Sequence, residues 1–93
     1  MAENALALKD PSLLKTQAYV NGRWIDGEKT FPVYNPATGE LVANVTDLGP
    51  SDVAGAVDAA HAAQPAWAAK TGKERAAVLR RWFDLMVENA DDL

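Results

Sequence analysis

The chain has 93 residues and a mass of 10.0 kDa, and its 9 Lys and Arg residues against 13 Asp and Glu residues give a formal net charge of −4. This acidic balance argues against a nucleic-acid-binding domain, which usually carries a strong basic excess. The sequence has no cysteine, so disulfides, thiolate metal sites and a cysteine nucleophile are excluded within it. No apolar run approaches the roughly 20 residues that span a bilayer, which argues against a membrane protein.

A leader with one short helical turn is predicted for residues 1–17. Asp10 can cap this turn, and Pro11 suits its first helical position because proline has no N–H to leave unpaired. The leader has Glu3 near its start instead of basic residues, and its apolar stretch stops at Lys9, so it does not resemble a secretory signal. Together with the lack of cysteine, this indicates a cytoplasmic location.

Residues at about 18–46 are predicted to form strands. Asn21-Gly22 separates two short apolar runs, and this dipeptide is a strong signal for a two-residue hairpin turn because both residues must take positive φ. A second pair of extended stretches is expected on either side of the turn-forming segment 35–39. Pro32 lacks an N–H, so its strand is expected at the edge of a sheet.

A first helix is predicted at about 51–64. Ser51 is expected to be its N-cap, and Asp52 would complement the positive end of the helix dipole. Pro65 removes a backbone donor, so the helix is expected to end or kink near Gln64.

A second helix is predicted at about 71–90. Thr71 and Glu74 form the sequence pattern of a capping box, in which each side chain accepts a hydrogen bond from the other residue's N–H. Apolar residues recur at helical spacing and form one wide stripe, at Leu79, Trp82, Phe83, Met86 and Ala90. Such a stripe usually packs inward, so we expect it to be a buried face.

Asp91 and Asp92 place two carboxylates at the end of this helix, where the helix dipole disfavours negative charge. They would suit the cap and first turn of a further helix better, and the sequence does not contain that helix. We therefore expect the 93 residues to be an incomplete chain. The alternative is a frayed polar tail.

Few residues could take part in catalysis or hold a ligand. His61 stands alone apart from Asp58 on the preceding turn, so a structural or solvent-exposed role is expected for it. Ser12 and Ser51 have no paired base, and the six glycines form neither a dinucleotide-binding motif nor a P-loop. The sequence therefore predicts no catalytic, cofactor-binding or metal-ligating residue.

Two groups of side chains could contact a partner. Basic residues gather around the second helix, and we interpret them as a solvated helix face rather than a patch for an anionic partner: Lys70, Lys73, Arg75, Arg80 and Arg81. Tyr19, Trp24 and Tyr34 are expected to pack within hairpins, since no basic residues alternate with them as they do in nucleic-acid stacking surfaces.

Four segments, taken in order and in one register, match a known pattern: Gln17–Trp24 (QAYVNGRW), Val33–Glu40 (VYNPATGE), Ala59–Trp67 (AAHAAQPAW) and Gly72–Met86 (GKERAAVLRRWFDLM). They resemble the opening of the NAD(P)-dependent aldehyde dehydrogenase superfamily. Within that superfamily, the segments Asp10–Ala18 and Arg80–Met86 look most like bacterial succinate-semialdehyde dehydrogenase.

The resemblance implies an α/β fold in which a β-hairpin, further strands and two helices form an incomplete piece of the family's cofactor-binding domain, at about residues 18–93. The family oxidises aldehydes with NAD or NADP, through a cysteine thiolate and a glutamate base that lie later in the family's sequence. Asn35 and Glu74 match family positions, but a turn and a capping box explain them.

The resemblance thus implies the N-terminal segment of an enzyme that, when complete, oxidises succinate semialdehyde to succinate as a homo-oligomer. The segment itself is expected to be inactive and to bind no cofactor. Its partners would be the remainder of the dehydrogenase or the family's subunits, with no nucleic acid and no membrane involved.

Two other functions remain open. The chain could be a stand-alone, non-catalytic interaction module that binds a partner, such as a full-length dehydrogenase subunit, through the stripe that contains Trp82 and Phe83. It could also be a helix pair that binds an anion or a nucleic acid between Lys70 and Arg81. The net charge argues against this last function.

Overall fold

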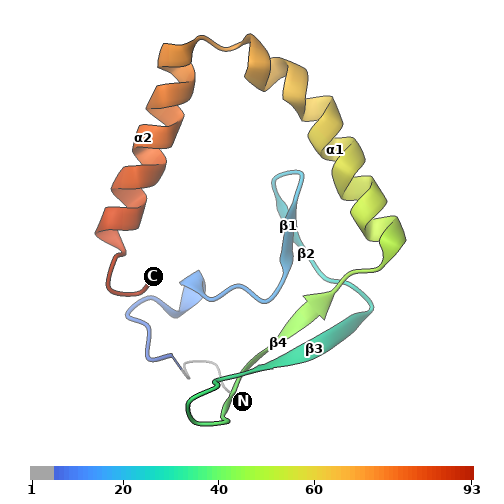
Figure 1. Ribbon diagram of the computed structural model, residues 1–93, viewed down its shortest axis with the longest axis vertical. Helices are drawn as coiled ribbons and strands as arrows, with labels where there is room; N and C mark the ends of the chain where they lie inside the picture. Colours follow the sequence, from blue (N-terminus) through green and yellow to red (C-terminus); the bar gives the residue numbers. More distant parts are fainter. Residues whose placement is uncertain (1–5) are drawn as a thin grey trace.

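The computed structural model describes residues 6–93, so the predicted leader is described only from residue 6 onward (Figure 1). Two antiparallel strand pairs are followed by two long helices, which confirms the predicted α/β class. The elements in chain order are the 3₁₀ helix η1 (Pro11–Leu13), the strands β1 (Ala18–Val20), β2 (Arg23–Ile25), β3 (Lys29–Tyr34) and β4 (Leu41–Asp47), and the helices α1 (Pro50–Ala69) and α2 (Gly72–Glu88).

The turn between β1 and β2 is the predicted two-residue hairpin. Asn21 and Gly22 both have positive φ, 51° and 76°, which matches the twist of the flanking strands. Across the pair, Tyr19 lies opposite Trp24, and their ring centroids are 4.8 Å apart at a tilt of 53°. The two rings therefore pack on each other within the hairpin, as the sequence predicts.

Strands β3 and β4 form the longer antiparallel pair, and a register shift follows Val33. The turn between them is closed by the Gly39 N–H, which donates to the carbonyl of Asn35 at 2.7 Å. Pro32 lies opposite Asn44 in β3, and each strand of a two-stranded sheet is an edge strand. The missing N–H of proline is tolerated there, as predicted.

Helix α1 departs from the prediction at both ends. It begins at Pro50 with Gly49 as the N-cap, so the assignment of Ser51 as N-cap is wrong. The Asp52 carboxylate instead accepts from the Gly49 N–H at 3.0 Å, which satisfies a donor just before the helix. The predicted end near Gln64 is also wrong, because the helix continues through Pro65 to Ala69.

Helix α2 begins as the sequence predicts. Thr71 is its N-cap, and the Thr71 hydroxyl accepts from the Glu74 N–H at 3.1 Å while the Glu74 carboxylate accepts from the Thr71 N–H at 2.9 Å. This reciprocal pair is the expected capping box. The helix ends at Glu88, two residues before the predicted end, with Asn89 as the C-cap.

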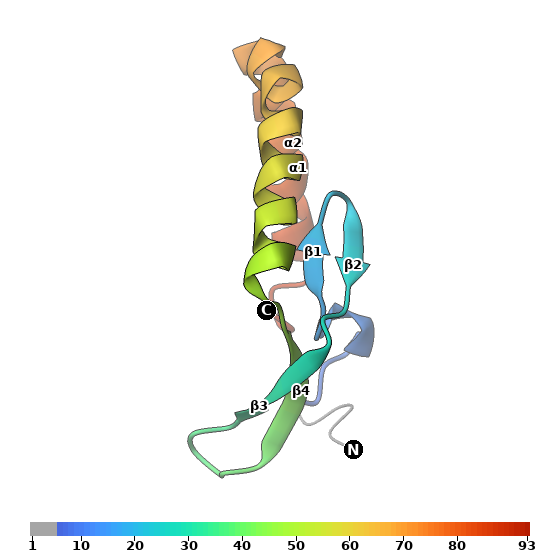
Figure 2. The same cartoon turned by 90° about the vertical axis from the view of Figure 1, so that its right-hand side faces the viewer.

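The elements form an open frame rather than a closed globule. Figure 1 shows α1 and α2 as the two sides of an arch, with the chain after α2 returning beside the leader, and Figure 2 shows how thin the frame is. The radius of gyration is 16.7 Å, whereas a compact domain of this length has about 12 Å. The accessible surface is 7423 Å², against roughly 5,200 Å² for a folded monomer of this mass.

The frame has no hydrophobic core of its own. Among residues 6–93 no hydrophobic side chain is buried, and the buried residue is Thr46, which is 9% exposed. The predicted burial of the stripe on α2 is therefore not met within this chain.

Candidate interaction surfaces

The most prominent apolar surface is one side of α2, formed by Leu79, Trp82, Phe83 and Met86 and called here the α2 apolar face. Trp82 is 61% exposed and Phe83 is 52% exposed, so neither ring is buried among residues 6–93. The opposite side of the helix is polar and carries two exposed ion pairs, Arg80–Asp84 at 3.4 Å and Arg81–Glu88 at 3.8 Å. This division of polar and apolar sides is typical of a helix that packs against another surface.

The ion pairs on the polar side account for part of the basic group around α2. The Arg80 guanidinium also lies 5.0 Å from the ring centroid of Phe83, at the border between the two sides. Each of these pairs is exposed, and exposed ion pairs contribute little to stability. The arrangement suits the interpretation of a solvated helix face and gives no concave site for an anion.

Helix α1 and the strands also expose large apolar side chains. On α1, Val53, Val57 and Trp67 are exposed, and on β3 so are Phe31 and Tyr34. Exposed apolar groups spread over several elements are more than scattered surface residues, because isolated folded chains rarely leave such groups uncovered. These surfaces therefore require cover from protein outside the described residues.

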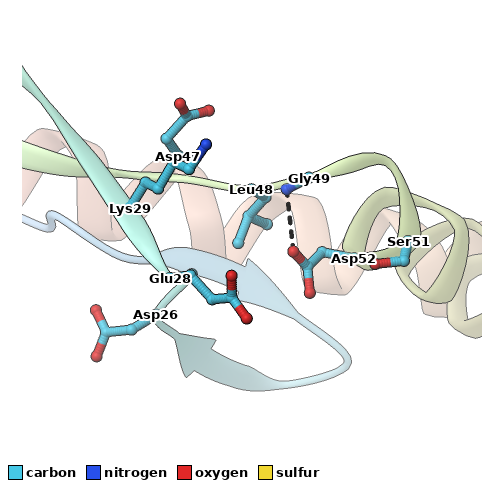
Figure 3. A pocket seen from close by; sticks show the side chains of 9 residues that line it. Asp26, Glu28, Lys29, Asp47, Leu48, Gly49, Ser51 and Asp52 are labelled. Atoms are coloured by element: carbon cyan, nitrogen blue, oxygen red, sulfur yellow. Dashed lines mark hydrogen bonds between the residues drawn. The ribbon is translucent and has the colours of Figure 1, made fainter.

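An open hollow of about 470 Å³ lies beside the start of α1, between that helix and the ends of β2 and β4 (Figure 3). Its lining is mainly acidic, with the carboxyl groups of Asp26, Glu28, Asp47 and Asp52 around Lys29. The Asp52 carboxylate is already bonded to the Gly49 N–H. The hollow could attract a cation, but the described residues contain no group of three His, Asp or Glu side chains arranged to hold a metal ion.

This hollow does not fit a dinucleotide cofactor. A helix N-terminus can bind phosphate through its free N–H groups and its positive dipole end. Here the Asp52 carboxylate supplies the anion at that end, and Asp26, Glu28 and Asp47 would repel a pyrophosphate. The residues that line the hollow therefore supply no phosphate-binding site.

The sequence-predicted candidates for chemistry lie apart from one another. His61 is exposed on α1, and Ser51 lies in the first turn of that helix at the rim of the hollow. The Ser12 hydroxyl donates to the Asp10 carboxylate at 2.6 Å, which makes it part of the cap of η1. Within residues 6–93, no hydrogen bond joins any of these three residues to another of them.

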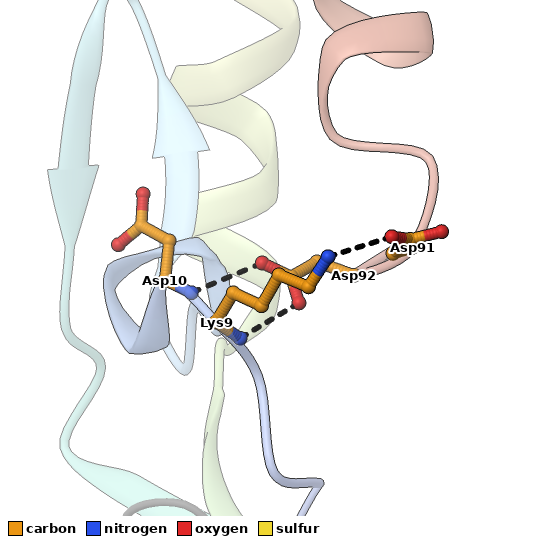
Figure 4. A network of polar contacts seen from close by, with 4 residues as sticks. All are labelled: Lys9, Asp10, Asp91 and Asp92. Carbon is orange, nitrogen blue, oxygen red and sulfur yellow. Dashed lines mark hydrogen bonds and ion pairs between the residues drawn. The ribbon is translucent and has the colours of Figure 1, made fainter.

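A polar cluster that the sequence did not predict joins the leader to the end of α2 (Figure 4). The Asp92 carboxylate accepts from the Lys9 N–H at 2.8 Å and from the Asp10 N–H at 3.0 Å. The Lys9 ammonium pairs with Asp91 at 2.7 Å. The two carboxylates interpreted as the start of a further helix thus bind the leader. Their position past a helix end was the only signal, and it did not reveal this partner.

None of the described helices is long and apolar enough to cross a membrane.

Comparison with known proteins identifies the family to which these elements belong. The model of the aldehyde dehydrogenase family matches residues 24–93. Glutarate-semialdehyde dehydrogenase of Pseudomonas putida is 51% identical over 90 residues, which are 95% of this chain and 19% of that protein. The NADP(+) succinate-semialdehyde dehydrogenase of Escherichia coli is 44% identical over 90 residues, with the same two coverages of 95% and 19%.

A solved structure shows the same arrangement of elements. The crystal structure of aldehyde dehydrogenase from Brucella melitensis biovar abortus 2308 superimposes with a TM-score of 0.89 at 55% identity, covering 92% of this chain and 18% of that one. The chain thus spans about a fifth of the length of the proteins that it matches. The family model, the sequence identity and the superposition agree over nearly all of the chain: it belongs to the aldehyde dehydrogenase family.

Proposed function

We propose that the chain is the N-terminal segment of an NAD(P)-dependent aldehyde dehydrogenase and forms the first part of its cofactor-binding domain, from about residue 18. The observation that carries this proposal is the combination of a family match over residues 24–93 with a frame that has no buried hydrophobic side chain among residues 6–93. A segment that covers a fifth of its relatives would gain its core from the remaining four-fifths.

The proposed reaction of the complete enzyme converts succinate semialdehyde, water and NAD(P)⁺ to succinate, NAD(P)H and two protons. The relatives named for succinate and for glutarate semialdehyde support a short aldehyde with a carboxylate at its far end. This chain has no cysteine, and the hollow beside the start of α1 does not fit the cofactor phosphates. We therefore assign it no catalytic step and expect residues 1–93 alone to be inactive.

The segment's own contribution is structural. The α2 apolar face and the exposed side chains of α1 would pack on the remainder of the cofactor-binding domain, and the capping box of α2 and the hairpins keep the frame ordered for that contact. The enzyme is further proposed to be a homo-oligomer, as members of this family usually are. A cytoplasmic location stays a prediction from the sequence.

The mass of the native protein tests this proposal directly. An antibody against residues 1–93 would capture the protein from its source for intact mass measurement. The captured material would then be assayed for NAD(P)H formation with succinate and glutarate semialdehyde, each with NAD⁺ and with NADP⁺. We expect a mass of several times 10.0 kDa and turnover of one of these aldehydes. The recombinant 93-residue chain is the control and should show none.

A stand-alone interaction module is the second candidate, and the exposure of Trp82 and Phe83 favours it. The same experiment separates the two functions. A captured mass near 10.0 kDa, with no turnover, would overturn the enzyme proposal and support the module. A large mass without turnover of either semialdehyde would retain the family segment and overturn the proposed substrate.

A further inference from the structure

The geometry points to Asp92 as a latch that holds residues 6–17, called here the leader strap, against the turn that follows α2. Both oxygens of the Asp92 carboxylate are used. One accepts from the Lys9 N–H at 2.8 Å and the other from the Asp10 N–H at 3.0 Å (Figure 4). These bonds join residues that are 82 and 83 positions apart in the sequence.

The backbone bonds of Asp92, rather than the ion pair of Asp91, make the latch. The Lys9 ammonium and the Asp91 carboxylate belong to side chains that are 76% and 79% exposed, and such pairs are weak because water screens them. Hydrogen bonds from backbone N–H groups to a carboxylate are charge-assisted, and two of them fix the orientation of the carboxylate. Of these two carboxylates, Asp92 therefore contributes more than Asp91 to holding the strap.

The far end of the strap is anchored on the sheet. The Thr46 N–H in β4 donates to the carbonyl of Thr16 at 2.8 Å, and Thr46 is the buried residue of the frame. The Gln17 side chain also donates to Asp26 at 2.9 Å, beyond the end of β2. One end of the strap is thus tied to the buried residue Thr46, whereas the other is bonded to the half-buried Asp92.

Between its two ends the strap is kept in shape by its own cap. The Asp10 carboxylate accepts from the Ser12 N–H at 3.1 Å and from the Ser12 hydroxyl at 2.6 Å, which orders the turn of η1. Because the Asp10 N–H bonds to Asp92 while its carboxylate caps η1, one residue couples the latch to the turn. The strap therefore links the turn after α2 to β4 through hydrogen bonds at both of its ends.

Hydrogen exchange of three amides tests the latch in the full product of the protein's own gene. Asp92→Asn replaces one of the two carboxylate oxygens with an N–H₂ group, so a hydrogen-bond donor then faces a backbone N–H, which is also a donor. We expect the Lys9 and Asp10 amides to exchange about tenfold faster in this variant, because their protection depends on that carboxylate. The Thr46 amide should keep its rate. Residue 92 is too distant in sequence to alter the intrinsic rates of these amides.

Asp91→Asn is the matched control, since it makes the same chemical change at the neighbouring residue. It should leave the Lys9 and Asp10 amides within about twofold of the unchanged protein, the size expected for an exposed ion pair. Unchanged rates at Lys9 and Asp10 in Asp92→Asn would overturn the latch. An equal acceleration of the Lys9 and Asp10 amides in Asp91→Asn would also overturn the latch. Faster exchange of the Thr46 amide in Asp92→Asn would overturn it too, because it would show that the whole structure had loosened.

Discussion

The Gly27 N–H donates a hydrogen bond to the Thr46 hydroxyl, which joins the loop before β3 to the middle of the frame. Thr46 is also bonded through its own N–H to the carbonyl of Thr16, so three segments meet at one residue. The site is tight: a Cβ at Gly27 would lie 2.8 Å from the carbonyl oxygen of Asp47. Among residues 6–93, which bury no hydrophobic side chain, this junction joins three segments through hydrogen bonds.

Replacing the Thr46 hydroxyl should loosen this junction. Thr46→Val has nearly the same shape but leaves the Gly27 N–H without its acceptor, and an unpaired, partly buried donor costs about 1–3 kcal/mol. We expect the opening free energy measured by hydrogen exchange at Gly27 to fall by an amount in this range. Thr46→Ser retains the hydroxyl and should keep most of the protection, and equal losses in the two variants would contradict this explanation.

Adding a single methyl group at Gly27 should also destabilise the protein. A Cβ there meets backbone oxygen, which cannot move aside as a side chain can, and overpacking of this kind costs about 1–3 kcal/mol. Gly55→Ala is the matched control, because a Cβ at Gly55 meets nothing within 4 Å and removes a glycine from the middle of α1. That control should stabilise α1 by up to about 1 kcal/mol. The two changes should shift the thermal unfolding midpoint in opposite directions.

The capping box of α2 should make that helix sensitive to acid. The Thr71 N–H, and then the Thr71 hydroxyl, hold the pKa of Glu74 below its ordinary value. With the pKa lowered in the folded helix, the box contributes its full stability above the pKa of the unfolded peptide. It loses that stability as the pH falls through the folded pKa. A peptide of residues 70–89 should lose helical circular dichroism over that range.

Two variants of the same peptide identify the responsible carboxylate. Glu74→Gln keeps an acceptor but cannot titrate, so the loss of helix on acidification should become smaller. Glu88→Gln removes a carboxylate from the other end of α2, where negative charge opposes the helix dipole, and it should leave the loss intact. If Glu74→Gln behaves like the unchanged peptide, the box does not control the acid response.

The α2 apolar face should be needed for assembly with the rest of the dehydrogenase. Phe83→Asp puts a carboxylate into a surface that must be covered, and burying an unpaired charge is strongly unfavourable. We expect the full gene product to lose most of its folded yield, measured by size-exclusion chromatography. Ala77→Asp adds the same charge to an exposed position on the polar side of α2 and should keep most of it. Comparable yields would show that this face is not covered.

The sequence predicts most accurately those features that neighbouring residues determine. Asn21-Gly22 fixes a hairpin because only two residues must take positive φ, and Thr71 with Glu74 fixes a helix start because the box closes over three residues. The family was likewise recognisable from segments in one register, and the family match confirms it. The exact aldehyde was not, because similar proteins are named for more than one semialdehyde.

The sequence fails to predict features that depend on residues far apart in the chain, or on which of two neighbouring residues starts a helix. Ser51 is a residue type that often caps helices, but Pro50 suits the first helical position, so the N-cap is Gly49. The bonds from Lys9 and Asp10 to Asp92 were not predicted, because these residues lie at opposite ends of the chain. Gly27 carried no signal at all, since its close approach to Asp47 exists only after β4 has paired with β3.

Pro65 within α1 has a mechanical consequence. It has no N–H to donate to the carbonyl of His61, so the hydrogen-bond ladder of α1 is interrupted one turn before the helix ends. An interrupted ladder resists bending less than a continuous one. The last turn of α1, which carries Trp67 and leads through Lys70–Thr71 to α2, is therefore held by one backbone hydrogen bond fewer than an uninterrupted turn would be.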